Sequence, residues 1–305
     1  MTLEQLRIFV AVAERQHVTQ AAHEINITQS AASSAIAALE ERYAVKLFDR
    51  IGRRIELTEA GRTFLIEARG VLARAATAEK ALADLAGLKR GSLSIYASQT
   101  IVNYWLPPFL AIFHRRYPDI HLKLKAGNTQ QVAAATHEGI ADIGFIEGAI
   151  DDPHLSVRSI EGDQLVVVVA PNHVFAGKER LEPADIKSMK WVLREPGSGT
   201  RGEFETALKS LSISLPDLDV ALELPSNEAV CAAVEAGAGA TAISNLVAEA
   251  GLLSGRLVSP EFTLPRRPFY VLHHKERYAS QAELALLELV GATVKPPARR
   301  RESAA

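Results

Sequence analysis

The sequence predicts a small helical domain, then a long helix, then an α/β domain. Residues 1–58 hold short helical segments joined by a tight connection, which is the layout of a helix-turn-helix. Residues 59–88 carry apolar side chains at alternating spacings of four and three, the heptad pattern of paired helices. From residue 89, strand-like and helical runs alternate, which favours an α/β architecture with mostly parallel strands.

Composition restricts the classes of protein that this chain can represent. With 305 residues, 48% of them hydrophobic and 23% charged, it can form two or three globular domains. The formal net charge of −2 means that any surface for nucleic acid must be local. The single cysteine, Cys231, excludes an intrachain disulfide, and we expect it to be a buried thiol. Without a signal-like or membrane-length apolar segment, we expect a cytoplasmic protein.

The first 58 residues contain start signals for three helices. Thr2 and Gln5 have the spacing of a capping box. We expect Thr19 to cap a second helix, "QAAHEI", and Thr28 to cap a third that continues through "SAASSAIAALE". This third helix has no charged residue from 25 to 39. One of its faces carries Gln29, Ser30, Ser33 and Ala37.

Two β-prone runs, residues 45–48 and 55–58, flank a turn that contains Gly52 and predict a hairpin. Arg50, Arg53 and Arg54 lie at its tip. In isolation these arginines fit two roles equally well, as solvated partners of nearby carboxylates or as contacts to phosphates. Beside a helix-turn-helix, phosphate contact is the favoured role.

The heptad segment follows Thr58, which we expect to cap it. At 1.5 Å per residue the helix would be about 45 Å long, more than a small domain can cover. Pairing with a second subunit is therefore favoured over packing on its own domain. The predicted seam consists of Phe64, Ala68, Val71, Ala75, Ala78, Leu82 and Leu85.

The remaining chain is predicted to form the α/β domain, residues 89–295, and a tail, residues 296–305. We expect strands at 92–97, 121–125, 143–146, 165–170, 240–243 and 268–274, and helices at 106–116, 130–138, 201–211, 228–236 and 281–289. The basic, proline-containing tail is expected to be disordered, with nonspecific phosphate contact as the alternative.

Three motifs, "LRIFVAVAE", "ITQSAASSAIAALEERYAVKLFDR" and "GRRIELTEAG", resemble LysR-type bacterial transcriptional regulators, and the resemblance extends over essentially the full length. It implies a winged helix-turn-helix DNA-binding domain (1–58), a dimerising linker helix (59–88) and a two-lobed effector-binding domain similar to type 2 periplasmic binding proteins (89–295). The stretches "GNTQQVAAATHEGIADIGFIEG" and "REPGSGTR" look most like the subgroup connected with sulfur metabolism and sulfite response.

A helix-turn-helix places its second helix in the major groove of double-stranded promoter DNA. Family members often carry a long polar side chain at the positions of Ser34 and Ala35, so we expect few guanine contacts here. Reading would rely on amide, hydroxyl and thymine-methyl contacts and on DNA shape. The predicted DNA-binding residues are Thr28, Gln29, Ser30, Ser33, Arg50, Arg53 and Arg54.

Small polar residues follow the predicted strands, where helix N-termini favour anions. Simple helix capping explains any one of these residues, but their joint occurrence favours a site for a small anion, and the subgroup implies sulfite or a related sulfur oxyanion. Glu147 would repel an anion and is left out of the set. The predicted effector-binding residues are Ser98, Thr100, Asn128, Gln130, Ser198, Thr200, Arg201 and Asn227.

Two other classes compete with a regulator. No catalytic or metal-binding motif is present, so we expect neither an enzyme nor a cofactor or metal. A small-anion or small-metabolite binding protein without a DNA role would explain residues 89–295 but not the first 58. The resemblance implies a homodimer or homotetramer through the linker helix, with RNA polymerase as a candidate partner and no contact with membranes.

Overall fold

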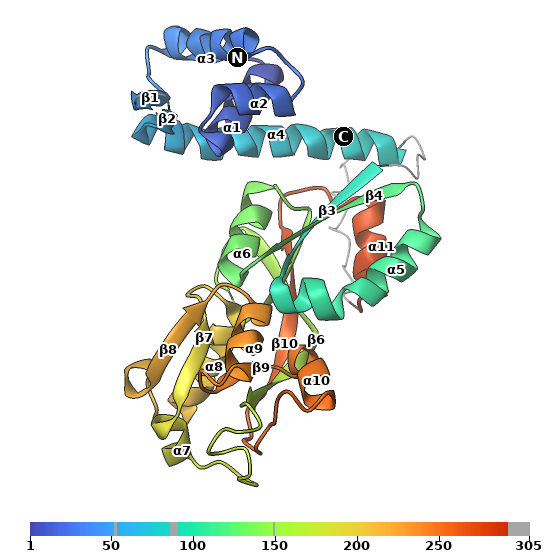
Figure 1. Ribbon diagram of the computed structural model, residues 1–305. Coiled ribbons are helices and arrows are strands. Elements are labelled where there is room, and N and C mark those ends of the chain that lie inside the picture. Colours follow the sequence, from blue (N-terminus) through green and yellow to red (C-terminus); the bar gives the residue numbers. More distant parts are fainter. Residues whose placement is uncertain (52–53, 86–90, 149, 292–305) are drawn as a thin grey trace. The chain divides into compact units, whose positions relative to one another are not determined.

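The computed structural model describes residues 1–51, 54–85, 91–148 and 150–291 (Figure 1). The chain forms two compact units, one of residues 1–86 with 138–140 and one of the remaining residues. No helix in the described ranges has both the length and the apolar character that crossing a membrane requires.

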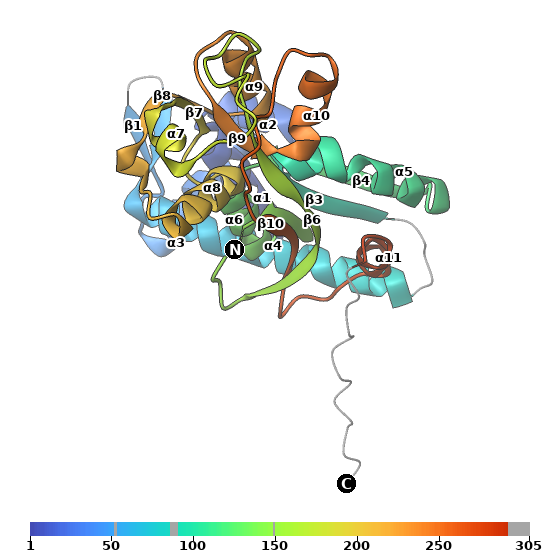
Figure 2. The same cartoon turned by 90° about the horizontal axis from the view of Figure 1, so that it is seen from below.

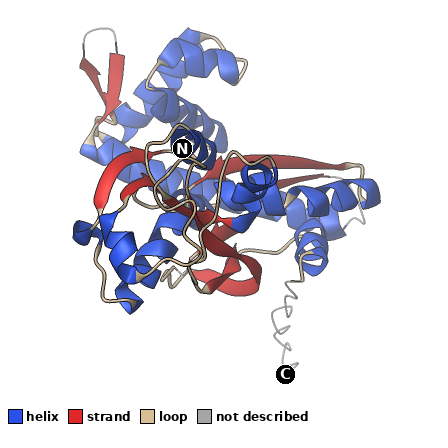
Figure 3. Cartoon of the chain, turned by 60° about the horizontal axis from the view of Figure 1, so that its bottom comes forward, coloured by secondary structure: helices blue, strands red, loops and turns tan. Residues whose placement is uncertain are grey.

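The first unit is helical apart from one hairpin, which stands out in red in Figure 3. Its elements are α1 (Leu3–Arg15), α2 (Val18–Glu24), α3 (Gln29–Tyr43), β1 (Phe48–Ile51), β2 (Arg54–Leu57) and α4 (Glu59–Leu85). The capping box of Thr2 and Gln5 and the N-cap at Thr28 are confirmed. Thr19 does not cap α2, because His17 precedes that helix and its Nδ1 accepts the Gln20 N–H at 3.4 Å.

The hairpin begins three residues later than predicted. Phe48 pairs with Leu57, whereas Val45 is exposed and outside the strand. The Phe48 ring lies 5.5 Å from the Phe9 ring, so this residue joins the hydrophobic core of the unit. Burial of Phe48 against α1 therefore determines where the strand starts, and the β-prone residues 45–47 before it do not belong to the strand.

Helix α4 runs without a break from Glu59 to Leu85 (Figure 2). The Gly61 N–H donates to Thr58 Oγ1 at 2.9 Å, which confirms the predicted cap. The predicted seam has two parts: Phe64 and Ala68 pack on the core of this unit, while Leu82 is 68% exposed. Among the described side chains of α4, the exposed large apolar ones are Ile66, Val71 and Leu82.

The second unit contains a six-stranded sheet in the order β4-β3-β5-β10-β6-β9 and a two-stranded sheet, β7-β8. The six-stranded sheet is mixed and the β7-β8 sheet is parallel, so the prediction of mostly parallel strands is only partly right. Strand β3 runs parallel to β4 and β5. Strand β10 is antiparallel to both of its neighbours, the short β5 and the long β6. The strands are β3 (Gly91–Ser98), β4 (Ile120–Gly127), β5 (Ile143–Glu147), β6 (Leu155–Val168), β7 (Lys190–Arg194), β8 (Asp219–Leu224), β9 (Thr241–Ser244) and β10 (Arg266–His274).

The five predicted helices of this unit are all present. Two further helices, α7 and α10, and strands β7 and β8 were not predicted, since their short apolar runs lack a clear period. The helices are α5 (Pro107–Arg116), α6 (Thr129–Glu138), α7 (Pro183–Ser188), α8 (Gly199–Ser210), α9 (Asn227–Glu235), α10 (Asn245–Leu253) and α11 (Gln281–Leu289), with a π-helical turn at Ile101–Trp105 and a 3₁₀ turn at Leu215–Asp217.

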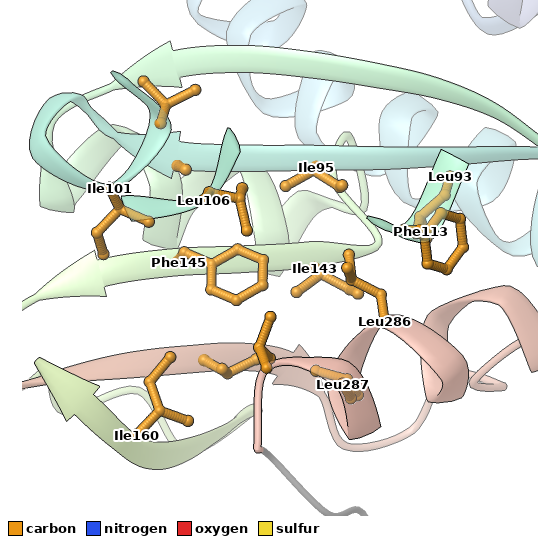
Figure 4. Close-up of a cluster of buried hydrophobic side chains, with 14 of the residues drawn as sticks. Leu93, Ile95, Ile101, Leu106, Phe113, Ile143, Phe145, Ile160, Leu286 and Leu287 are labelled. Atoms are coloured by element: carbon orange, nitrogen blue, oxygen red, sulfur yellow. The ribbon is translucent and has the colours of Figure 1, made fainter. Parts of the chain in front are cut away.

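Separate cores define two lobes. Lobe I surrounds Ile95, Phe145 and Leu286, from β3, β5 and α11 (Figure 4). Lobe II surrounds Trp191 and Phe204, from β7 and α8. Strands β6 and β10 continue from one lobe into the other (Figure 1). Each lobe thus has its own core, and the two lobes, which β6 and β10 connect, contact each other along a boundary.

Cys231 is half-buried, not fully buried as predicted. It packs with the apolar residues between α9 and β9. Burial raises the pKa of its thiol to about 11, with Glu235 and Glu228 adding to the effect. The thiol therefore stays protonated near neutral pH, consistent with a packing role.

Candidate DNA-binding surface and interlobe site

The first turn of α3 gathers the predicted base-reading residues on one exposed patch. Thr28 Oγ1 accepts the Ala31 N–H at 3.2 Å and lies 3.0 Å from Ser30 Oγ. Gln29 Nε2 donates to Ser33 Oγ at 2.9 Å. These side chains hold one another in place, and their hydrogen-bonding groups are at the end of the helix that a helix-turn-helix directs at base edges.

The hairpin carries two of the three predicted phosphate-contacting arginines in its strands. Arg50 pairs with Ile55 and Arg54 with Ile51 across the ladder. Arg53 lies outside the described residues.

A single carboxylate connects α3 to the start of the hairpin. Glu40 Oε1 accepts the Leu47 N–H at 2.8 Å and the Phe48 N–H at 3.3 Å, and Lys46 Nζ donates to Oε2 at 2.7 Å. Burial opposes ionisation, but these hydrogen bonds hold the pKa of Glu40 below its ordinary value. Sequence reasoning missed Glu40, because an acidic residue at the end of an apolar helix face has many surface roles.

In the second unit, the carboxyl ends of β3, β4 and β5 meet at one edge of the sheet. Ser98 pairs with Gly127, and Ala97 with Phe145 one residue earlier. Ser98 is 2% exposed, and within the described part of the chain its Oγ has no hydrogen-bond partner. An unsatisfied buried hydroxyl costs about 1–3 kcal/mol, so this one calls for an explanation.

Residues at the start of α6 meet the loop before α8 from the other lobe. Asn128 Nδ2 donates to Glu195 Oε1 at 3.3 Å, and the Gln130 N–H donates to the Gly197 carbonyl at 3.4 Å. A Cβ on Gly199 would stand 2.3 Å from the Glu147 carbonyl oxygen. Glycine at 199 therefore allows the two lobes to approach with no side chain between them.

Asn227 connects the lobes through a buried network. Its Nδ2 donates to Thr100 Oγ1 at 3.2 Å, its backbone N–H donates to Gln99 Oε1 at 3.1 Å, and its Oδ1 accepts from Arg194 Nη1 at 2.5 Å. Arg194 also forms a two-point ion pair with Glu195, at 2.8 and 3.0 Å. Gln99 and Arg194 were not predicted, although both lie within or beside stretches singled out in the sequence.

A second buried arginine, Arg267, also stands at the boundary. It donates to Asp163 at 2.5 and 3.0 Å and to Thr200 Oγ1 at 3.3 Å. Burial opposes its charge, but the hydrogen bond to Asp163 and the nearby carboxylates of Glu147 and Glu203 keep its pKa above the ordinary value. Arg267 therefore remains a cation, and Glu147 is one of the carboxylates near it.

Arg201 is turned to a different set of partners. It donates to Glu205 Oε1 at 2.8 Å and to the Arg194 carbonyl at 3.0 Å, and it pairs with Glu223 at 3.0 Å. Its charge is already balanced by two carboxylates. Ser198 is buried before α8, but its side chain caps no N–H of that helix. The structure thus brings together Ser98, Thr100, Asn128, Gln130, Thr200 and Asn227, called here the interlobe site, with Arg194 and Arg267 in place of Arg201.

Comparison with known proteins follows the same division of the chain. Residues 3–62 match the bacterial regulatory helix-turn-helix protein family of lysR type, and residues 86–295 match the LysR substrate binding domain. The chain belongs to the LysR family of transcriptional regulators. It is therefore a DNA-binding regulator with an effector-binding domain, and not an enzyme.

Named LysR relatives span nearly the whole chain. The uncharacterized transcriptional regulator YeiE of Escherichia coli K12 is 36% identical over 285 residues, covering 92% of this chain and 94% of YeiE. The RuBisCO operon transcriptional regulator of Allochromatium vinosum is 31% identical over 292 residues, covering 95% of each chain. Full-length CbnR in complex with its target DNA has the same fold, with a TM-score of 0.69, 24% identity, and 96% and 100% coverage.

Proposed function

We propose that this LysR regulator responds to a small anion bound at the interlobe site. The unpartnered hydroxyl of Ser98 is the observation that carries the proposal. Thr100 and Asn227 lie in the same boundary and are 1% and 0% exposed, so their polar groups are shielded from solvent. A compact ligand with several oxygen acceptors fits hydroxyl, amide and backbone N–H donors better than a large aromatic effector does.

Sulfite or a related sulfur oxyanion is the effector that we propose, because of the likeness of residues 127–148 and 194–201 to sulfite-responsive regulators. Calorimetry with sulfite, sulfate, thiosulfate and phosphate tests the class and the identity together. Binding of sulfite in preference to phosphate supports the proposal. The absence of heat with all four at millimolar concentration contradicts it.

Ser98→Ala separates a ligand role from a structural one. The fold makes no use of this hydroxyl, so we expect its removal to keep or raise the melting temperature while anion affinity falls. Ser92→Ala, at the other end of β3, is the matched control and should change neither. A loss of stability in Ser98→Ala with unchanged affinity would show that the hydroxyl serves the fold.

On the DNA side, we propose that Thr28, Gln29, Ser30 and Ser33 read base edges and that Arg50, Arg53 and Arg54 contact phosphates. Gln29→Ala or Ser33→Ala should then reduce the preference for operator over random DNA. Arg53→Ala should weaken binding to both and lower the salt dependence by about one phosphate contact. If the salt dependence of DNA binding were unchanged in Arg53→Ala, the proposal that the hairpin contacts phosphates would be wrong.

We also propose that the exposed turns of α4 pair two copies of the chain. Ile66, Val71 and Leu82 are 55%, 43% and 68% exposed. Val71 and Leu82 are about three helical turns apart on one face of α4, and exposed apolar side chains on one face favour a helical partner. Leu82→Glu should then shift the mass measured by light scattering toward the monomer, whereas the exposed Glu79→Gln should not. A gel shift with the upstream DNA, with and without anions, distinguishes this regulator from a binding protein without a DNA role.

A further inference from the structure

The buried arginine of the boundary is surrounded by an excess of negative charge. Asp163, Glu147 and Glu203 all raise the pKa of Arg267 through their charges. Asp163 and Glu147 are buried, as is Arg267. One positive and three negative charges leave this cluster at −2 when every group is ionised, and burying unbalanced charge is costly. A bare anion that enters beside it meets electrostatic opposition.

The three carboxylates differ in how they are held. Asp163 accepts two hydrogen bonds from Arg267 and one from Ser244 Oγ, so it is stabilised as the anion. Glu147 lies at the end of a fully buried strand, away from solvent. Glu203 is only half-buried, and within the described ranges its carboxylate forms no hydrogen bond or close ion pair. Of the three, Glu203 is the one that solvent protons can reach.

Glu203 also stands at the contact between the lobes. It belongs to the first turns of α8 in lobe II, and its Oε1 lies 3.2 Å from where a Cβ on Gly148 would be, directly after Glu147 of lobe I. Burial raises the pKa of Glu203; Arg267 pulls it down, and Glu147 and Asp163 push it up again. The net effect is a carboxyl group poised to accept a proton when more negative charge arrives.

We propose that the interlobe site takes up its anion together with one proton, and that Glu203 is the residue that receives it. The inference rests on the proposed anion-binding function. The carboxylate of Glu203 and a solvent proton become a carboxylic acid, so binding of a dianion such as sulfate brings the total charge of cluster and ligand to −3 instead of −4. The new O–H is also a hydrogen-bond donor, whereas the ionised carboxylate can only accept.

Calorimetry of the full-length protein with sulfate or thiosulfate tests this, since these ions do not exchange protons near neutral pH. At one pH, titrations in buffers of different ionisation enthalpy give the number of protons taken up. We expect about one per site between pH 7 and 8, with affinity falling about tenfold per pH unit as linkage requires. Binding with the same heat in every buffer would overturn the inference but leave the anion site intact.

Glu203→Gln keeps the shape of the side chain and removes its proton exchange. We expect this variant to bind the anion at least as tightly as the wild type, with no proton uptake and little pH dependence. Glu249→Gln, on the exposed face of α10, should behave as the wild type does. Proton uptake that persists in Glu203→Gln would assign the proton to another group and overturn the inference. No binding of any anion by the wild type would instead overturn the proposed function.

Discussion

Replacement of Gly199 by alanine tests whether the two lobes must approach as closely as the structure shows. The added Cβ would meet the Glu147 carbonyl oxygen at 2.3 Å and Thr129 Oγ1 at 2.5 Å, although real Cβ contacts essentially never fall below 3.0 Å. The start of α8 must therefore retreat from lobe I by at least about 0.7 Å, the difference between 3.0 and 2.3 Å. Thr200 follows directly, and its 3.3 Å hydrogen bond from Arg267 leaves little room for such a shift.

The expected cost follows from overpacking, which destabilises by about 1–3 kcal/mol when neighbours cannot move. If the ligand requires the close approach, Gly199→Ala should weaken anion affinity by roughly 5- to 150-fold in calorimetry, which is the same energy range. DNA binding by the first unit should remain, as a gel shift on low-salt operator DNA would show.

Gly202→Ala is the matched control, three residues further along the same helix. A Cβ there would meet no atom within 4 Å, and alanine favours helix by up to about 1 kcal/mol over glycine. Gly202→Ala should therefore keep the affinity and slightly raise the melting temperature. Wild-type affinity in Gly199→Ala would refute the reasoning, because the ligand would then bind without close contact between the lobes.

Three further predictions concern single interactions. Thr28→Ala removes the cap of α3 and should cost about 1 kcal/mol of stability in denaturant unfolding, together with a loss of operator affinity. Glu40→Gln should lower the salt dependence of DNA binding more than the exposed Glu41→Gln, by displacing the hairpin from α3; equal slopes in the two variants would argue against this. The pKa of Glu40 is lowered on folding, so the stability that its carboxylate contributes is present above the unfolded pKa and is lost as pH falls through the folded pKa. In an acid titration, the free energies of unfolding of the wild type and Glu40→Gln should therefore converge as the pH falls below the ordinary pKa of a glutamate. Arg267→Met leaves Asp163 buried without its cation and should destabilise the second unit by about 3–5 kcal/mol in thermal denaturation.

Local patterns in the sequence were sufficient for most helices and for the order of the units. The caps at Thr2, Thr28 and Thr58 act within three residues of themselves, so their spacing in the sequence already contains their geometry. The exception at α2 is of the same local kind, since an imidazole nitrogen replaces the hydroxyl of Thr19 as the cap. The polar residues after β3 and β4 could also be predicted from the sequence, because the carboxyl ends of neighbouring parallel strands lie at the same edge of a sheet.

The roles of the charged residues were decided only by tertiary structure. Arg201 follows a glycine-rich loop and looks suited to an anion, yet Glu205 and Glu223 hold it elsewhere. Arg267 meets Asp163 from 104 residues away. A long flexible cation can reach many acceptors, and which one it meets depends on how distant strands are brought together. The sequence by itself therefore determined the family, most of the helices and the small polar groups between the lobes, whereas the fold decided which charges face them.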